Sequence, residues 1–99
     1  MQRHLIVTAD DFGLHQTVNE AVEQASRGGI LTAASLMVAG PAAADAVRRA
    51  RRLPNLRVGL HIVLADGLSS LPHRQIPSIA DAEGRIGRAV QSLFVEVAG

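Results

Sequence analysis

The alternation of short apolar runs with helical patterns is the feature that most constrains the fold of this chain. Three runs rich in aliphatic and β-branched residues occupy residues 4–9, 32–38 and 57–64. Each has the length and composition of a buried β-strand. A strand–helix–strand–helix–strand order over residues 4–64 predicts parallel strands joined by right-handed crossovers. Because the runs are continuously apolar, we also expect both faces of this sheet to be covered.

The two segments between the runs have helical spacing of their apolar side chains. Thr17 and Glu20 have the spacing of a capping box, which predicts a helix that begins near Thr17 and stops at Gly28 and Gly29. Its buried face is expected to carry Val18, Ala21, Val22 and Ala25. A second helix is expected over about residues 42–53. Its cluster of arginines is expected to form a solvated face: Arg48, Arg49, Arg51 and Arg52.

The pattern changes after Leu64. Residues 65–85 contain prolines and glycines among scattered polar residues, which predicts a long loop of the kind that is often functional. A helical pattern returns over about residues 86–98. We expect one partial α/β domain over residues 1–99, because this length allows only one small domain. A closed eight-stranded barrel needs about 200 residues or more, so 99 residues can supply only part of one.

Composition excludes several kinds of site and partner. The sequence has no cysteine, which excludes disulfides, thiol catalysis and cysteine-based zinc sites. A formal net charge of +1 gives no electrostatic reason to expect a nucleic acid partner. No segment approaches about 18 consecutive apolar residues, so no membrane span is expected. The N-terminal run is too short for a signal peptide, and a cytoplasmic location is the default expectation.

Two groups of polar side chains follow predicted strands. Asp10 and Asp11 come directly after the first run, and His61 lies near the end of the third. Active sites of parallel α/β folds gather at the carboxyl ends of the strands. Two adjacent ionised carboxylates repel each other, and a bound cation or a proton on one of them relieves this repulsion and gives them different roles. Successive strand residues point to opposite faces, so the two need not share a role unless the chain turns at Phe12 and Gly13.

Each of these residues also has a structural interpretation. One aspartate could cap a loop while the other is solvated, and His61 could be a core histidine among aliphatic neighbours. Alternatively, a carboxylate and an imidazole could begin a divalent-metal site, and the absent side chain of Gly59 leaves space for a ligand. A catalytic metal normally takes three protein ligands. His15 and His73 are the only further candidates in loops, and both are expected to be surface residues.

Four segments of the chain carry a combined signature. They are residues 8–14 together with 18–21, residues 31–38, residues 58–64 and residues 77–85. Together they resemble the YdjC/ChbG-like carbohydrate deacetylases over essentially the whole chain. The TADDFG and GLH motifs are the most specific part of this resemblance, and residues 41–63 look most like the hopanoid biosynthesis-associated branch.

The resemblance implies a metal-dependent hydrolase on a (β/α)-barrel-like fold. Its reaction would remove acetyl groups from an N-acetylated sugar or glycolipid-type substrate. Carried over by position, Asp11 and His61 would be ligands of Mg²⁺ or Zn²⁺, and Asp10 would be the general base. Such an ion lowers the pKa of a bound water, polarises the acetyl carbonyl and stabilises the oxyanion of the tetrahedral intermediate.

The chain departs from the family pattern in three places. His15 and Gln16 stand where a small residue and a proline are usual, and Ile86 stands where a phenylalanine usually follows Gly84 and Arg85. These departures concern the fit of the substrate more than the chemistry. The family's third metal ligand, a histidine further along, has no counterpart in these 99 residues. We therefore expect an incomplete and inactive fragment of such an enzyme.

Two other classes of function explain less of the sequence. A receiver-type signalling domain also places an acidic pair after its first strand, but it needs an aspartate at the end of the third strand and a later lysine. Here His61 occupies that strand, and the chain has no lysine. A non-catalytic interaction module is the other alternative. An open edge of its sheet would invite pairing with a second copy, so a homo-oligomer is expected in that case.

Overall fold

The computed structural model describes residues 1–87, and the chain divides into two compact units, residues 1–61 and the segment from residue 62 onward. In the first unit a three-stranded sheet is formed by β1 (Thr8–Phe12), β2 (Ala33–Leu36) and β3 (Arg57–Leu60). Helix α1 (Gln16–Gly28) follows β1, and α2 (Ala43–Ala50) follows β2. All three strands are parallel, in the order β1-β2-β3. This confirms the expected α/β class, in which parallel strands alternate with helices.

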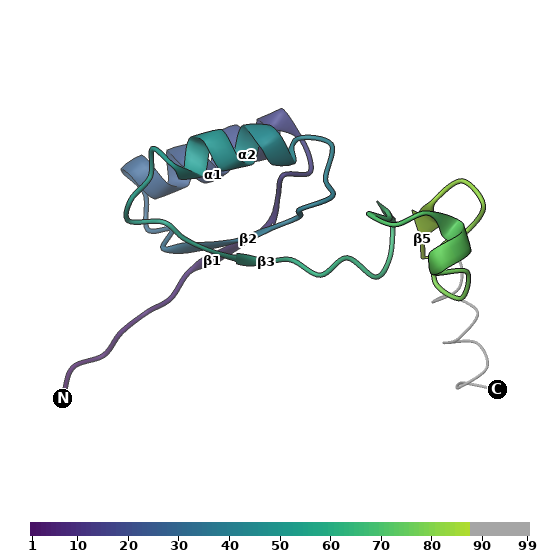
Figure 1. Cartoon of the computed structure of the whole chain (residues 1–99). Helices are drawn as coiled ribbons and strands as arrows, with labels where there is room; N and C mark the ends of the chain where they lie inside the picture. The colour runs from purple at the N-terminus through teal and green to yellow at the C-terminus, as the bar shows by residue number, and fades with distance from the viewer. Residues whose placement is uncertain (88–99) are drawn as a thin grey trace. The chain divides into compact units, whose positions relative to one another are not determined.

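Both helices lie on the same side of the sheet (Figure 1). The expectation that both faces are covered is therefore wrong for the described part of this unit. A consecutive strand order with its crossover helices on one side is the arrangement with which a (β/α) barrel begins. Phe12 and Ala34 are buried on the helix side. Because strand side chains alternate, Ser35 belongs to the helix-free face, where it stands in register with Gly59.

The second unit is described by itself over residues 62–87. Strand β4 (Gly67–Leu68) pairs antiparallel with β5 (Arg85–Ile86), and a short 3-10 helix, η1 (His73–Gln75), lies between them in the chain. The segment expected to be a long loop, residues 65–85, thus contains β4 and the first residue of β5. Ile86, expected to begin the last helix, belongs to β5, and residues 88–98 of that helix lie outside the described residues. The single domain expected over residues 1–99 stays a prediction.

The strand ends differ from those expected because a strand needs a neighbour to supply hydrogen bonds. Leu5 and Ile6 are exposed and precede β1, since β2 begins only at Ala33. At the other end, Phe12 belongs to β1 rather than to a turn, and its carbonyl accepts a hydrogen bond of 2.7 Å from the Met37 N–H. Likewise, β3 ends at Leu60 and does not extend through Leu64.

His15, rather than Thr17, caps helix α1. The His15 side chain accepts a hydrogen bond of 3.2 Å from the Thr17 N–H, and its Nδ1 lies 2.9 Å from the Thr17 hydroxyl. Thr17 is already inside the first turn, so the expected capping box with Glu20 does not define the start of this helix. The expected buried face is also partly wrong, because Ala21 is exposed while Asn19 and Val22 are buried.

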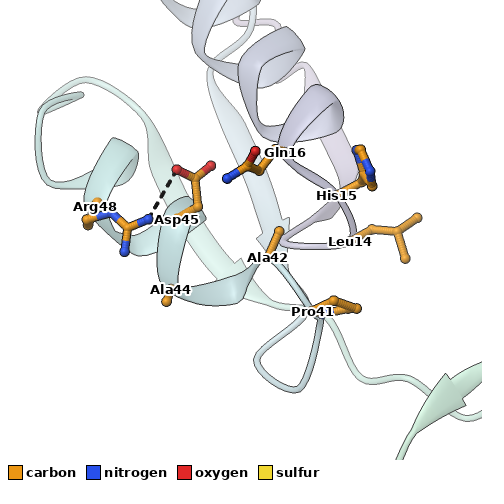
Figure 2. A pocket seen from close by; sticks show the side chains of 8 residues that line it. All are labelled: Leu14, His15, Gln16, Pro41, Ala42, Ala44, Asp45 and Arg48. Carbon is orange, nitrogen blue, oxygen red and sulfur yellow. Dashed lines mark hydrogen bonds and ion pairs between the residues drawn. The ribbon is translucent and has the colours of Figure 1, made fainter.

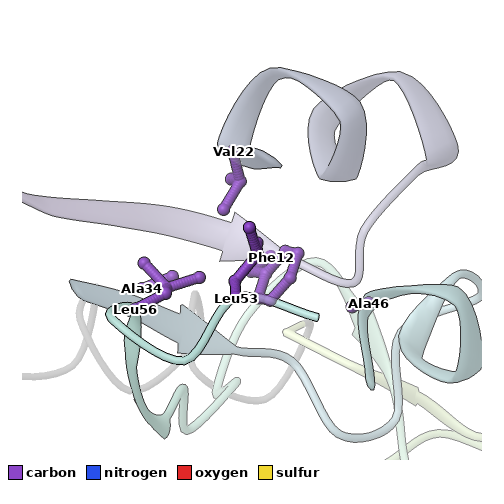
Figure 3. Close-up of a cluster of buried hydrophobic side chains, with 6 residues drawn as sticks. All are labelled: Phe12, Val22, Ala34, Ala46, Leu53 and Leu56. Carbon is purple, nitrogen blue, oxygen red and sulfur yellow. The ribbon is translucent and has the colours of Figure 1, made fainter. Parts of the chain in front are cut away.

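A small apolar core lies between the two helices and the sheet (Figure 3). Its buried members are Phe12, Val22, Ala34, Ala46, Leu53 and Leu56. Helix α2 ends at Ala50, before the expected end at Leu53. The chain continues as a turn in which the Leu53 N–H donates to the Ala50 carbonyl at 3.0 Å. Leu53 therefore reaches the core without being part of the regular helix.

Asn19 ties the loop after β1 to the beginning of α2. It is fully buried, and its Oδ1 accepts a hydrogen bond of 2.7 Å from the Gly13 N–H. Its amide group donates to the Ala42 carbonyl and to Asp45 Oδ2, both at 3.0 Å. A Cβ atom at Gly40 would clash with the Gly13 carbonyl oxygen, so this close approach requires glycine. The turn that follows Asp10 and Asp11 is thus fixed by buried hydrogen bonds.

Arg49 connects α1 to α2 through two ion pairs. Its guanidinium contacts Glu23 at 2.7 Å and Asp45 at 2.8 Å. Its side chain is only 20% exposed, so the expected fully solvated face is wrong for this arginine. Hydrogen bonds from Arg49 and then Arg27 hold the pKa of Glu23 below its ordinary value. The hydrogen bond from Asn19, followed by that from Arg49, lowers the pKa of Asp45.

Acidification is expected to destabilise this unit through Glu23 and Asp45. Their ordinary pKa values are 4.5 and 3.8, and both pKa values are lower in the folded state. The two ionised carboxylates therefore contribute their full stabilisation of the folded state at a pH above their ordinary pKa values. That contribution is lost as the pH falls through their lowered pKa values in the folded state. Thermal unfolding between about pH 5 and about pH 2 should show a falling Tm, with a shallower fall in an Arg49→Gln variant. Equal slopes in the two proteins would contradict this account.

Candidate functional site

An extra residue at the end of β1 brings both aspartates to the same edge of the sheet. Ala9 is in register with Ala34 and Phe12 with Leu36, so three steps along β1 oppose two steps along β2. Asp11 adopts a φ of 62°, a left-handed conformation that aspartate tolerates better than most residues. Such bulges re-aim side chains and occur often beside active sites. The change of direction expected at Phe12 and Gly13 therefore occurs earlier, at the bulge in β1 that contains Asp11.

Four polar side chains converge at this edge, from β1, from β2 and from the residue that follows β3. Ser35 Oγ lies 3.2 Å from Asp10 Oδ1 and 3.3 Å from His61 Nδ1. The Asp11 N–H donates to His61 Nδ1 at 3.4 Å, and Asp11 Oδ1 lies 3.8 Å from the same nitrogen. The structure thus brings together the three residues predicted from the sequence, Asp10, Asp11 and His61. His61 is not a core histidine, because its side chain is 26% exposed.

The serine, histidine and aspartate at this edge do not form a nucleophilic triad. In such a triad one ring nitrogen of the histidine faces the hydroxyl and the other faces the carboxylate. In this chain Ser35 and Asp11 both approach Nδ1 of His61. One nitrogen cannot accept the serine proton while it donates a proton to the carboxylate, so activation of Ser35 as a nucleophile has no support in this geometry.

The donor set is chemically suited to a divalent cation. Because Nδ1 of His61 accepts the 3.4 Å hydrogen bond from the Asp11 N–H, it is the unprotonated ring nitrogen, which is the form that ligates a metal. Two ligands about 2.1 Å from one tetrahedral zinc ion lie roughly 3.4 Å apart, close to the observed separation of 3.8 Å. Within residues 1–87 no cluster of three or more His, Cys, Asp or Glu side chains is present. Asp11 and His61 therefore fit as two ligands of an incomplete set.

The other histidines considered as ligands have structural roles. His15 caps α1 through Thr17. His73 Nδ1 lies 2.6 Å from the Ala80 carbonyl oxygen, within the second unit. Such a short contact identifies Nδ1 as the protonated nitrogen that donates to the carbonyl. Both histidines are exposed, as expected for surface residues.

A pocket of about 340 Å³ lies at the beginnings of α1 and α2 (Figure 2). Its lining consists of Leu14, His15, Gln16, Pro41, Ala42, Ala44, Asp45 and Arg48. It includes none of the residues that converge at the ends of the strands. Asp45 is already paired with Arg48 and Arg49 and bonded to Asn19. This pocket is separate from the edge that carries Asp10, Asp11 and His61.

Ser35 is the polar residue of this edge that the sequence analysis missed. It stands in the carboxyl half of β2, flanked by Ala34 and Leu36. A lone hydroxyl in an apolar strand was a signal, since its neighbours on either side face the opposite way. Its significance depends on the register with Gly59 and on the bulge in β1, neither of which a strand pattern reveals.

None of the helices described in residues 1–87 has the length and apolar character needed to cross a membrane.

Comparison with known proteins matches this chain to one family. The family model for YdjC-like protein covers residues 4–98. The carbohydrate deacetylase of Geobacillus stearothermophilus is 40% identical over 93 residues, which are 94% of this chain and 37% of that protein. The chitooligosaccharide deacetylase of Serratia marcescens is 38% identical over 88 residues, or 89% of this chain and 34% of that protein. The chain therefore spans little more than a third of these relatives.

A solved structure supports the same relationship at the level of the fold. It is a protein of Enterococcus faecalis V583 with a suggested role in cellobiose-phosphate cleavage. The match has a TM-score of 0.79 and 31% sequence identity, and it covers 92% of this chain and 35% of that one. The alternation of strands and helices predicted from the sequence is thus found in a solved relative, in agreement with a partial barrel-like fold.

Proposed function

Because this chain belongs to the YdjC-like protein family, we propose that it supplies part of the active site of a metal-dependent carbohydrate deacetylase. The reaction is hydrolysis of the amide that joins an acetyl group to a sugar nitrogen. Its products are acetate and a free amine. The observation that carries the proposal is the convergence of Asp10, Asp11 and His61 at the carboxyl ends of the sheet. The deacetylase names of the similar proteins support the same reaction class.

Asp11 and His61 are the residues that would hold the metal, with Mg²⁺ or Zn²⁺ as the proposed ion. Their carboxylate oxygen and imidazole nitrogen are 3.8 Å apart, and both ligand types suit such cations. When bound, the ion would supply Lewis-acid polarisation of the acetyl carbonyl and a lower pKa for its water. The left-handed turn at Asp11 directs this carboxylate toward His61, and the bonds of Asn19 hold the turn that follows.

Asp10 is proposed as the general base. Its carboxylate accepts a hydrogen bond from Ser35, whereas the carboxylate of Asp11 faces Nδ1 of His61. It would take one proton from the attacking water as that oxygen adds to the acetyl carbon. The same proton would then go to the sugar nitrogen when the amide bond breaks. This division gives the two adjacent carboxylates different tasks, as their mutual repulsion requires.

Residues 1–99 are proposed to be insufficient for turnover by themselves. A catalytic zinc normally takes three protein ligands and a water. Asp11 and His61 supply two, and the described residues contain no larger cluster of His, Cys, Asp or Glu. The missing ligand is expected from sequence that the longer relatives have in addition to the matched segment.

The substrate class is proposed to be an N-acetylated sugar, either free or as the head of a glycolipid. The sugar follows from the names of the relatives. The glycolipid alternative rests on the resemblance of residues 41–63 to the hopanoid-associated branch. A non-catalytic interaction module is the competing function, and the exposure of every residue of β3 favours it. That alternative gives no account of why Asp10, Asp11 and His61 converge, so we favour the deacetylase.

A chimeric enzyme tests the proposed function directly. Residues 4–98 of this chain would replace the matching segment of the Geobacillus stearothermophilus carbohydrate deacetylase. We expect the chimera to release acetate from an N-acetylated chitooligosaccharide in the presence of Zn²⁺ or Mg²⁺, because the segment supplies Asp10, Asp11 and His61. The isolated 99-residue chain should release none. A folded chimera without activity would contradict the deacetylase proposal, and acetate release by the isolated chain would contradict its proposed inactivity.

A further inference from the structure

Two adjacent carboxylates compete for the same cation unless something separates them. Asp10 and Asp11 meet at one edge of the sheet because of the bulge in β1, and both carboxylates are chemically able to ligate a metal. The proposed function needs Asp10 as a base and Asp11 as a ligand. The side chain that distinguishes them in this structure is Ser35, whose hydroxyl oxygen lies 3.2 Å from Asp10 Oδ1.

The single proton of the Ser35 hydroxyl has two acceptors within reach. One is Asp10 Oδ1, and the other is His61 Nδ1 at 3.3 Å. Hydrogen bonds to an ionised acceptor are stronger than those to a neutral one, so the proton belongs on Asp10. Nδ1 of His61 then accepts only the long 3.4 Å hydrogen bond from the Asp11 N–H. The Ser35 hydroxyl thus donates to Asp10 and does not compete with a metal for the lone pair of His61.

We infer that Ser35 is a positioning residue that holds Asp10 away from the metal and thereby keeps it available as the base. This inference rests on the proposed function. Among residues 1–87 no hydroxyl donates to the Asp11 carboxylate, whose Oδ1 lies 3.8 Å from His61 Nδ1. Without the Ser35 hydroxyl, Asp10 would be free to rotate toward the cation and become an additional ligand.

The surroundings of Ser35 allow the hydroxyl to be removed without disturbing the fold. Ser35 is only partly buried, on the helix-free face. Its partner in register is Gly59, where an added Cβ would have no atom within 4 Å. Ser35→Ala removes one hydroxyl oxygen and leaves the backbone pairing of β2 intact. Ser35→Thr keeps the hydroxyl and adds a methyl group, which suits a strand position, so it is the matched control.

Zn²⁺ titration of the 99-residue chain by calorimetry provides a double-mutant cycle. With Ser35 present, Asp10→Asn should weaken Zn²⁺ binding by no more than about fivefold, as for an exposed charge nearby. In the Ser35→Ala background, the same Asp10→Asn change should weaken binding by at least about tenfold, because Asp10 has become a ligand. In the Ser35→Thr background, Asp10→Asn should again weaken Zn²⁺ binding by no more than about fivefold. Circular dichroism of each variant checks that the fold is retained.

The outcomes separate this inference from the proposed metal site. An equal effect of Asp10→Asn in the two backgrounds would overturn the role of Ser35, and so would a Ser35→Thr protein that behaves like Ser35→Ala. The metal site itself is tested by Asp11→Asn, which should weaken Zn²⁺ binding in every background. If Asp11→Asn has no effect, or if the unaltered chain binds no Zn²⁺, the metal site and the role of Ser35 both fail. If Asp11→Asn weakens Zn²⁺ binding but Asp10→Asn has the same effect with and without the Ser35 hydroxyl, only the role of Ser35 fails.

Discussion

Replacing Asp10 with asparagine in the chimeric deacetylase is expected to lower acetate release by about 10²–10⁴-fold, the usual contribution of a general base. Asparagine preserves the size of the side chain and can still accept the Ser35 hydrogen bond, but it cannot take the proton of the attacking water. Zn²⁺ affinity should stay within about fivefold of the unaltered chimera, because Asp10 is not a ligand. The measurements are acetate release under saturating substrate and calorimetric titration with Zn²⁺.

Asp66→Asn is the matched control for this prediction. Asp66 is also an aspartate and, with a φ of 54°, has a left-handed backbone like that of Asp11. It belongs to the second unit and has no role in the proposed mechanism, so acetate release should be unchanged. Loss of Zn²⁺ binding in Asp10→Asn would show that this residue is a ligand rather than the base. Retention of full turnover would remove it from the mechanism.

Replacing Phe12 with alanine is expected to lower the free energy of unfolding by about 3–5 kcal/mol, the typical cost of removing a buried phenylalanine. Phe12 has no exposed surface and is the largest fully buried side chain of the described core. It belongs to the cluster of buried apolar side chains drawn in Figure 3. A loss of this size is a large part of the stability of a small domain.

Urea unfolding followed by far-ultraviolet circular dichroism measures this change, since the chain has no tryptophan or tyrosine. Leu60→Ala is the control. Leu60 is a comparably large apolar side chain on β3 but is 64% exposed, so its removal should change the stability by no more than about 0.5 kcal/mol. A Phe12→Ala protein as stable as Leu60→Ala would mean that the core around Phe12 does not determine the stability of this unit.

The order of elements in the first unit could be predicted from the sequence because it depends on local patterns. Apolar runs and helical spacing predicted three strands and two helices in the correct succession. Their boundaries were less accurate where a distant partner decides them. Leu5 and Ile6 look like strand residues but stand beyond the beginning of β2, so no neighbour completes their hydrogen bonds.

The main residues of the candidate site could also be predicted from the sequence, but their supporting contacts could not. Asp10, Asp11 and His61 were selected because they follow strands that must end at the same edge. Two contributors were missed, Ser35 and Asn19. Ser35 matters through its contacts with Asp10 and His61, at sequence separations of 25 and 26 residues. Asn19 lies within the predicted helix, but its full burial and its hydrogen bonds to Gly13 and Ala42 depend on the folded chain.

The patterns along the chain were enough to predict the alternation of strands and helices and to select the three residues of the proposed site, and the resemblance of the motifs indicated the family. They could not reveal that both helices cover one face of the sheet, or that a bulge turns Asp11 toward His61. The contact of Ser35 with Asp10 likewise became visible only in the folded chain. The physical reason is that register, bulges and hydrogen-bond partners are set between strands, where neighbouring side chains come from residues far apart in the chain.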